Sequence, residues 1–134
     1  MTSDYREQFD KTVDALLENI DLIVGEDRSK LVSYKLMLNV AKMTGLHIDY
    51  FYNAISPYKT QILERDEKFF TEKATNDTSL SESIGLIDHW NKLNDKNKDI
   101  IWEYVTILYV YSCYSKDLYE EAAEIYKHNL LKLG

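Results

Sequence analysis

The stretch IIWEYVTILYVYSCY, residues 100–114, decides the fold of this 134-residue chain. It is apolar on nearly every side of a helix, interrupted only by Glu103, Thr106 and Ser112. Its β-branched and aromatic residues would suit a strand, but the run is long for a strand and its flanks are helical. It is also too short to cross a bilayer, which takes about 20 apolar residues. The sequence therefore predicts a buried central helix over about residues 96–114.

An amphipathic helix is predicted near the beginning of the chain. Asp4 and Glu7 form a capping box, and Gly25 is placed to end the helix. Between them, apolar residues recur at helical spacing. We expect these residues to face the core: Phe9, Val13, Leu16, Leu17, Ile20 and Val24.

A second helix is expected after Asp27 or Ser29, running to Gly45. The short link at residues 25–27 predicts that it packs antiparallel to the acidic first helix. Its lysines should then lie near the acids of the first helix; they are Lys30, Lys35 and Lys42.

Three further segments are inferred from their boundaries. A third helix must end near Ser56, because Pro57 lacks an amide hydrogen and restricts the residue before it. The Ser56–Pro57 pair predicts a following helix that continues to Phe70. Residues 74–79 are the most loop-like stretch, and another helix is expected from Ser79 to a break near Asn94, with Trp90 facing inward.

A last helix is expected after Ser115 or Asp117. Its inward face is predicted to carry Leu118, Ala122, Ile125 and Tyr126. Together the segments predict an all-α fold, a compact bundle of about five to six helices around the central helix at about 96–114. The chain has the size of one ordinary domain, so we expect residues 1–134 to form a single helical domain.

The composition limits the kinds of partner that the chain is expected to bind and the compartment in which it is expected to lie. The formal net charge of −7 and the absence of a basic patch predict that the chain binds neither nucleic acid nor anionic membranes. The N-terminal residues lack the basic start and apolar run of a signal peptide, so an intracellular location is expected. A single cysteine, Cys113, excludes a disulfide within one chain.

Residues able to do chemistry are few. His47, His89 and His128 are expected at surface or boundary positions; His47 with Asp49, or Glu124 with His128, offers only two metal ligands. Cys113 lies in the most apolar segment, where a thiol is expected to be buried and inert. The tyrosines of residues 104–114 are expected to pack in the core with their hydroxyls reaching the surface. We therefore expect no enzyme activity, no cofactor and no metal.

Two segments carry a further pattern. The first comprises Phe51, Ile55, Pro57, Tyr58, Ile62, Asp66, Glu67, Phe69 and Phe70, and the second Trp90, Leu93, Asn97, Lys98, Ile101, Trp102, Tyr104 and Leu108. In these residues, over about 51–108, the chain resembles a family of short, uncharacterised all-helical proteins of giant nucleocytoplasmic DNA viruses. The resemblance implies an intracellular viral protein of the host cytoplasm or virion and carries over no catalytic residue. The helix from Asp117 onward departs from it.

These features favour a non-enzymatic viral protein-interaction module that binds another protein, host or viral. The alternative is a virion or assembly component that associates with itself, and an enzyme is the third interpretation. The candidate contact residues combine aromatic groups with flanking acids: Pro57, Tyr58, Asp66, Glu67, Phe69 and Phe70. The competing interpretation is that the two phenylalanines anchor this segment to the core while the two acids cap a helix that starts there.

Overall fold

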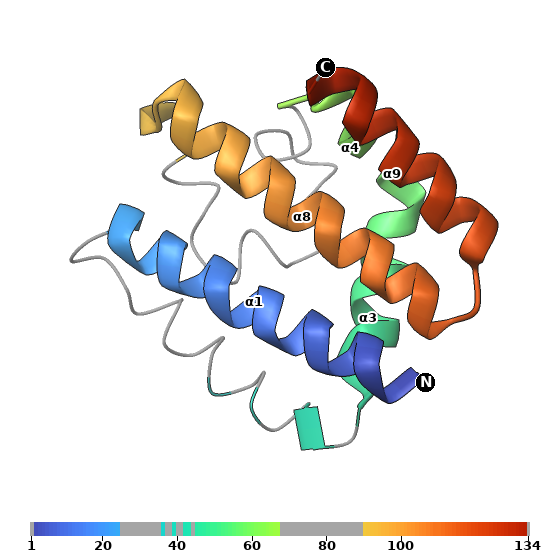
Figure 1. Ribbon diagram of the computed structural model, residues 1–134. Coiled ribbons are helices and arrows are strands. Elements are labelled where there is room, and N and C mark those ends of the chain that lie inside the picture. Colours follow the sequence, from blue (N-terminus) through green and yellow to red (C-terminus); the bar gives the residue numbers. More distant parts are fainter. Residues whose placement is uncertain are drawn as a thin grey trace.

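The computed structural model describes residues 2–24, 45–67 and 90–133, together with positions 36, 39, 42 and 43. Most of these residues are helical, and the predicted all-α fold is confirmed. They include four α-helices of ten residues or more, slightly fewer than the five to six expected for the whole chain, and one shorter helix. In Figure 1, α1, α8 and α9 lie side by side, with α3 and α4 behind them.

The predicted central helix is confirmed as α8, Asp95–Ser115, which packs against α1, α3, α4 and α9. The helix begins near the predicted break at Asn94, which is its N-cap. The Asn94 side chain accepts a hydrogen bond from the Asn97 amide at 2.8 Å, so one backbone donor of the first turn has a partner. Three neighbouring i, i+4 rows form its buried face. They comprise Ile101, Trp102, Val105, Thr106, Leu108, Tyr109, Ser112 and Cys113.

Helix α1, Thr2–Val24, runs antiparallel to α8. At one end the rings of Tyr5 and Tyr114 stack with centroids 4.8 Å apart, and at the other Asn19 Nδ2 donates to Tyr104 Oη at 3.2 Å. Its predicted core residues from Phe9 to Ile20 are buried. The predicted start is wrong by three residues, because a cap at Asp4 would make Tyr5 the first helical residue, whereas the helix begins at Thr2.

Helix α3, Leu46–Ile55, follows Gly45, whose φ of 76° is left-handed. A Cβ at Gly45 would lie 2.9 Å from the guanidinium of Arg6, so both the backbone and the space favour glycine. The helix ends one residue before Ser56, as predicted from Pro57, and Ser56–Tyr58 form the 3-10 turn η1.

Two helices depart from the predicted boundaries. Helix α4 covers only Lys59–Glu64 and does not continue to Phe70, because Arg65 adopts a left-handed conformation with φ 53°. Helix α9, Tyr119–Leu133, begins later than predicted, since Asp117 is left-handed (φ 61°) and belongs to the turn after α8. The short turn makes α8 and α9 an antiparallel hairpin (Figure 1).

The described helices share one hydrophobic core. Trp90, in the 3-10 turn η3 (Trp90–Lys92), is fully buried and meets Trp102 edge to face at 5.9 Å, as its predicted inward position requires. Ala122 and Ile125 are also buried, but Tyr126 is 56% exposed, so its predicted inward orientation is wrong. The rest of the predicted second helix, the 74–79 loop and the helix from Ser79 lie outside the described residues.

Candidate functional site

The predicted contact region follows the end of α3. Pro57 is exposed, while Tyr58 is partly buried and packs against the core. The left-handed Arg65 closes α4, and the Asp66 amide donates to the Gln61 carbonyl at 2.9 Å. Asp66 is partly exposed and Glu67 exposed. The structure thus brings Pro57 and Tyr58 to one end of α4 and the two acids to the other; Phe69 and Phe70 lie outside the described residues.

Ion pairs connect the acidic end of this region to the start of α8. Glu67 Oε1 lies 2.6 Å from Lys98 Nζ, and this hydrogen bond lowers the pKa of the Glu67 carboxyl. The same ammonium group lies 5.5 Å from the centre of the Trp90 ring, within cation–π range. Arg65 pairs with Asp99 at 3.5 Å. Glu67 therefore has a structural role between α4 and α8, which is more than capping a helix.

A second feature precedes this region on the solvent side of α3. Leu46 is 65% exposed and Tyr50 57% exposed, on one face of the helix that continues toward exposed Pro57. Met43, just before Gly45, is 84% exposed. We call Met43, Leu46, Tyr50 and Pro57 the α3 outer stripe. Exposed large apolar side chains in a row are a feature of binding surfaces, whereas single ones are common on any protein.

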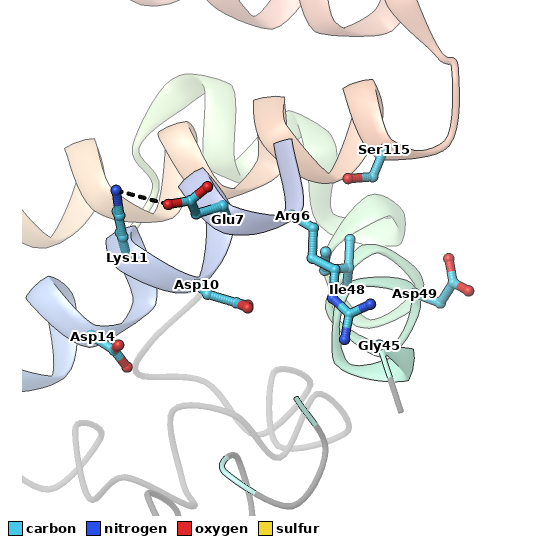
Figure 2. Close-up of a pocket in the computed structure, with 9 residues that line it drawn as sticks. All are labelled: Arg6, Glu7, Asp10, Lys11, Asp14, Gly45, Ile48, Asp49 and Ser115. Atoms are coloured by element: carbon cyan, nitrogen blue, oxygen red, sulfur yellow. Dashed lines mark ion pairs between the residues drawn. The ribbon is translucent and has the colours of Figure 1, made fainter. Parts of the chain in front are cut away.

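An open pocket of about 560 Å³ lies between the first half of α1 and the start of α3 (Figure 2). Its wall is mostly charged, and the acids outnumber the bases. The lining residues are Arg6, Glu7, Asp10, Lys11, Asp14, Gly45, Ile48, Asp49 and Ser115. Most of these charges already have partners: Lys11 pairs with Glu7 at 3.1 Å and Asp49 with Lys116 at 2.9 Å.

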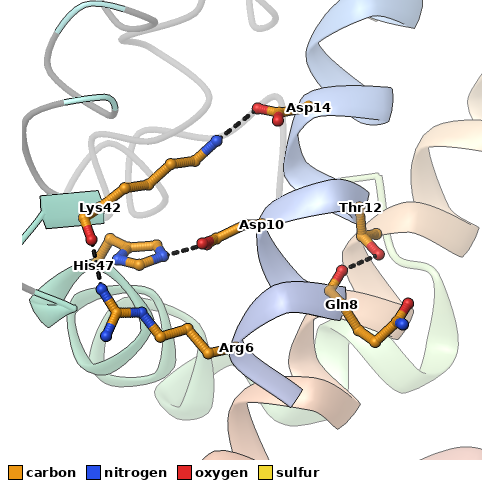
Figure 3. Close-up of polar contacts among 7 residues, drawn as sticks. All are labelled: Arg6, Gln8, Asp10, Thr12, Asp14, Lys42 and His47. Atoms are coloured by element: carbon orange, nitrogen blue, oxygen red, sulfur yellow. Dashed lines mark hydrogen bonds and ion pairs between the residues drawn. The ribbon is translucent and has the colours of Figure 1, made fainter. Parts of the chain in front are cut away.

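A polar network beside the pocket joins α1 to the segment before α3 (Figure 3). Arg6 donates to the Lys42 carbonyl, and Lys42 Nζ contacts Asp14 Oδ1 at 2.7 Å. The predicted proximity of Lys42 to the acids of the first helix is thus confirmed, while Lys30 and Lys35 lie outside the described residues. Such exposed pairs contribute at most about 1 kcal/mol each.

His47 is buried, contrary to the expected surface or boundary position. Its Nε2 contacts Asp10 Oδ1, and the Phe9 ring meets it edge to face at 5.6 Å. Its Nδ1 is buried without a hydrogen-bond partner in the described part of the chain. The Ser115 hydroxyl is also buried and unpaired there, so Ser115 and His47 do not hydrogen bond, and the structure assembles no serine–histidine–aspartate triad from these residues.

In both candidate pairs of metal ligands, side chains contact other residues. His47 faces Asp10 while Asp49 faces Lys116, and Glu124 forms an ion pair with Lys59. Over residues 2–24, 45–67 and 90–133, no three histidine, cysteine or acidic side chains are grouped as metal coordination would require.

The Glu121 carboxylate accepts hydrogen bonds in the interior between α3, α8 and α9. Tyr109 Oη donates to it at 2.9 Å and Tyr52 Oη at 3.1 Å, and Cys113 Sγ lies 3.7 Å away. Burial, and secondarily the Glu121 charge, raises the pKa of the Cys113 thiol to about 12. Cys113 is therefore a neutral thiol at physiological pH, in agreement with the predicted inert cysteine. The hydroxyl of Tyr109 was expected to reach the surface. This prediction is wrong, because Tyr109 is fully buried.

Comparisons with known proteins add no relative: no family model, no curated protein and no solved structure matches this chain. Within the described residues, none of the helices combines the length and the apolar character needed to span a bilayer.

Sequence reasoning missed the contact of His47 with Asp10 and the hydrogen bonds to the half-buried Glu121. The contact of His47 with Asp10 joins residues 37 positions apart, and no local pattern indicates it. Glu121 lies in a run of similar acids, Glu120, Glu121 and Glu124. One sequence feature could have distinguished Glu121 from the other acids. It lies one residue before Ala122 and four before Ile125, which places it at the edge of the inward face of the helix.

Proposed function

We propose that this chain is a non-enzymatic protein-interaction module that binds another protein through the α3 outer stripe and the adjoining Pro57–Glu67 region. The observation that carries the proposal is the exposure of Leu46 and Tyr50 on one face of α3. Removing such side chains from water favours association, and aromatic residues are enriched in binding hot spots.

The geometry of the region supports this use. The stripe is carried by a helix that buries His47, Ile48, Phe51 and Ile55 on its other side, so its backbone is anchored. The ion pair of Glu67 with Lys98 likewise holds the acidic end of the region against α8. A partner would therefore meet a pre-organised surface, which lowers the entropic cost of binding.

The non-enzymatic part of the proposal rests on the state of the reactive side chains. Cys113 is a buried thiol with a raised pKa, and His47 is held by Asp10 inside the core. Both groups therefore serve the packing of helices. The proposed setting, an infected cell, follows from the resemblance to the viral family in residues 51–108.

The test is affinity capture from infected cells followed by mass spectrometry, with two matched variants. Tyr50→Glu places a charge on the α3 outer stripe, and Tyr126→Glu places the same charge on α9, where the tyrosine is equally exposed. We expect a specific protein that is lost with Tyr50→Glu and retained with Tyr126→Glu. Melting temperatures of both variants report whether the fold is intact. Capture that is unaffected by Tyr50→Glu in a folded protein would refute the proposal.

The alternative function, a self-associating virion or assembly component, is favoured by a different surface, formed by α1, α8 and α9.

A further inference from the structure

The outer side of the α1–α8–α9 layer is almost free of charge. On α8, the sixteen residues from Ile100 to Ser115 contain one charged residue, Glu103. The residues on the outer side of the helix include Ile107, which is 40% exposed, and the half-buried Tyr111 and Tyr114. From Ile107 to Tyr114 the solvent-facing ridge of the central helix is therefore apolar or aromatic, and Glu103, one turn before Ile107, is the one charge on it between Ile100 and Ser115.

The flank of α1 beside this ridge carries no charge from Tyr5 to Leu22. Tyr5 and Asn19 contact Tyr114 and Tyr104 of α8, which places their side of α1 next to the ridge. The residues on that side repeat with helical spacing and carry no charge: Tyr5, Gln8, Thr12, Ala15, Asn19 and Leu22. Asp4, one turn before Gln8, falls on this side by the same spacing, whereas the seven charged residues of α1 from Arg6 to Asp21 lie elsewhere on the helix. Figure 3 shows Arg6, Asp10 and Asp14 pointing away from Gln8 and Thr12.

Helix α9 completes the surface. Tyr119 and Tyr126 are 53% and 56% exposed, and Ala123 between them is exposed on the same side. Tyr119 lies 5.8 Å from Tyr114 of α8, measured between ring centroids. Ile107 lies seven residues before Tyr114, and Tyr126 lies seven residues after Tyr119. Because α8 and α9 are antiparallel, both residues are about 10 Å farther from the turn along the hairpin. We call the outer side formed by these parts of α1, α8 and α9 the neutral face.

The polar groups of the neutral face are partly satisfied within the chain. Thr12 Oγ1 donates to the Gln8 carbonyl at 2.7 Å, and Asn19 Nδ2 to the Ala15 carbonyl at 2.9 Å. Burying a polar group that already has a hydrogen bond costs far less than burying an unpaired one. This face can therefore be removed from water at low cost.

We propose that the neutral face binds a second copy of this chain, forming a symmetric dimer. The distribution of charge favours a second copy as the partner. Two copies each carry a net charge of −7 and repel one another over most of their surface. On the neutral face they bring few like charges together, because its acids, Asp4 and Glu103, lie toward the N-terminal ends of their stretches of α1 and α8. A face built to bind a basic partner would instead carry acids. Depletion of charge with enrichment of aromatic residues is also the compositional signature of an interface core.

The area suits a small interface. The sixteen residues Ile100–Ser115 of α8 and the fifteen residues of α9 are each about 24 Å long or slightly less, and three packed helices span roughly 20 Å between the outer axes. The projected face is therefore roughly 500 Å², before the relief of the side chains is added. Standard interfaces bury roughly 600–1,000 Å² on each partner, so this face lies near the lower end of that range.

The test is sedimentation velocity of the full chain over a wide concentration range. We expect a dimer, with twice the 15.8 kDa mass of one chain, for the unaltered protein. We introduce one negative charge on each helix of the face, with the variants Gln8→Glu, Ile107→Glu and Tyr126→Glu. Each variant should raise the dissociation constant of the dimer at least about tenfold, because dimerisation would bury an unpaired charge. Tyr50→Glu, on the α3 outer stripe, should change the dissociation constant less than about twofold. Circular dichroism checks that all four variants remain folded.

Salt provides an independent readout. Raising NaCl from about 0.05 M to about 0.5 M shortens the Debye length severalfold and screens the repulsion between two acidic copies. The dissociation constant should therefore fall or stay constant. A protein that remains monomeric up to about 1 mM, a dimer untouched by the three face variants, or a dissociation constant that rises more than about twofold with salt would each overturn the inference. Because the α3 outer stripe is a different surface, capture of another protein there can fail or succeed independently.

Discussion

The carboxylate of Glu121 on α9 accepts a hydrogen bond from the fully buried hydroxyl of Tyr109 on α8, with 2.9 Å between the oxygen atoms. Tyr52 of α3 donates to the same carboxylate, so one side chain joins three helices. Replacing Glu121 with Ala leaves two hydroxyls without their acceptor. We expect a loss of about 2–4 kcal/mol in the free energy of unfolding, measured by urea denaturation. The neighbouring exposed Glu120→Ala should change it by less than about 0.5 kcal/mol, and equal losses in both variants would contradict this role.

The same cluster predicts a loss of stability in alkali. Burial, followed by the hydrogen bond to Glu121, raises the pKa of Tyr52 from 10.0 to about 12. A group whose pKa is higher in the folded state binds its proton more tightly there, so its stabilising contribution is complete below pH 10 and is lost as the pH rises toward 12. Tyr52→Phe should therefore lose less unfolding free energy than the unaltered protein between pH 10 and 12. At pH 8 to 9 the difference between the two proteins should be constant; a parallel decline of both up to pH 12 would exclude Tyr52 as a contributor.

The Cys113 thiol should be unreactive in the folded protein. Burial raises its pKa to about 12, and the nearby Glu121 charge adds to the effect, so little thiolate forms at pH 8. A disulfide reagent should label Cys113 only at the rate of unfolding, and instantly in urea. The matched control is Glu120→Cys, an exposed position on α9 outside the neutral face that should react within seconds. Rapid labelling of the folded, unaltered chain would show that the α8–α9 contact opens.

Trp102 tests the central helix. It is buried against Trp90, and its replacement by Ala should cost about 3–5 kcal/mol, whereas Ile107→Ala on the exposed ridge should cost much less. With Trp90 replaced by Phe, Trp102 becomes the sole tryptophan, and iodide should quench its emission only weakly in the native state. Quenching as strong as in the unfolded chain would refute its burial.

Gly45 tests the junction between α1 and α3. Gly45→Ala should destabilise the protein by about 1–2 kcal/mol through its left-handed backbone, with a further loss because the new methyl group meets the Arg6 guanidinium. A double-mutant cycle separates the two causes. In an Arg6→Ala background the steric part disappears while the backbone part remains. Identical penalties in both backgrounds would mean that Arg6 moves aside freely.

The sequence predicted those parts of the fold that rest on local periodicity. Ile101, Trp102 and Leu108 were expected in the core, and they are buried, because α8 has no wide polar side that could turn them outward. The end of α3 was predictable because Pro57 acts on its immediate neighbours.

The errors arise where a tertiary contact or an unusual backbone decides. Nothing local marks Arg65 as left-handed, since such positions usually hold glycine, so the end of α4 was missed. Tyr126 was assigned inward from helical spacing, but it lies at the margin of the buried side, where a tyrosine can remain in water. For the candidate site, the sequence identified exposed Pro57 and Glu67 but not the pairing of Glu67 with Lys98, which joins residues 31 positions apart.

The packing of α1 on α8 has a consequence for synthesis. Residues 25–94 lie between the two helices, and a ribosome adding about 5–20 residues per second needs roughly 5–20 s to pass from the end of α1 to the end of α8. During that interval Phe9, Leu16 and Ile20 have emerged while the helix that covers them does not yet exist. During synthesis, the apolar side of α1 therefore stays accessible until α8 has been made. We expect the nascent chain to bind cotranslational chaperones, and we expect N-terminal fragments that lack α8 to aggregate.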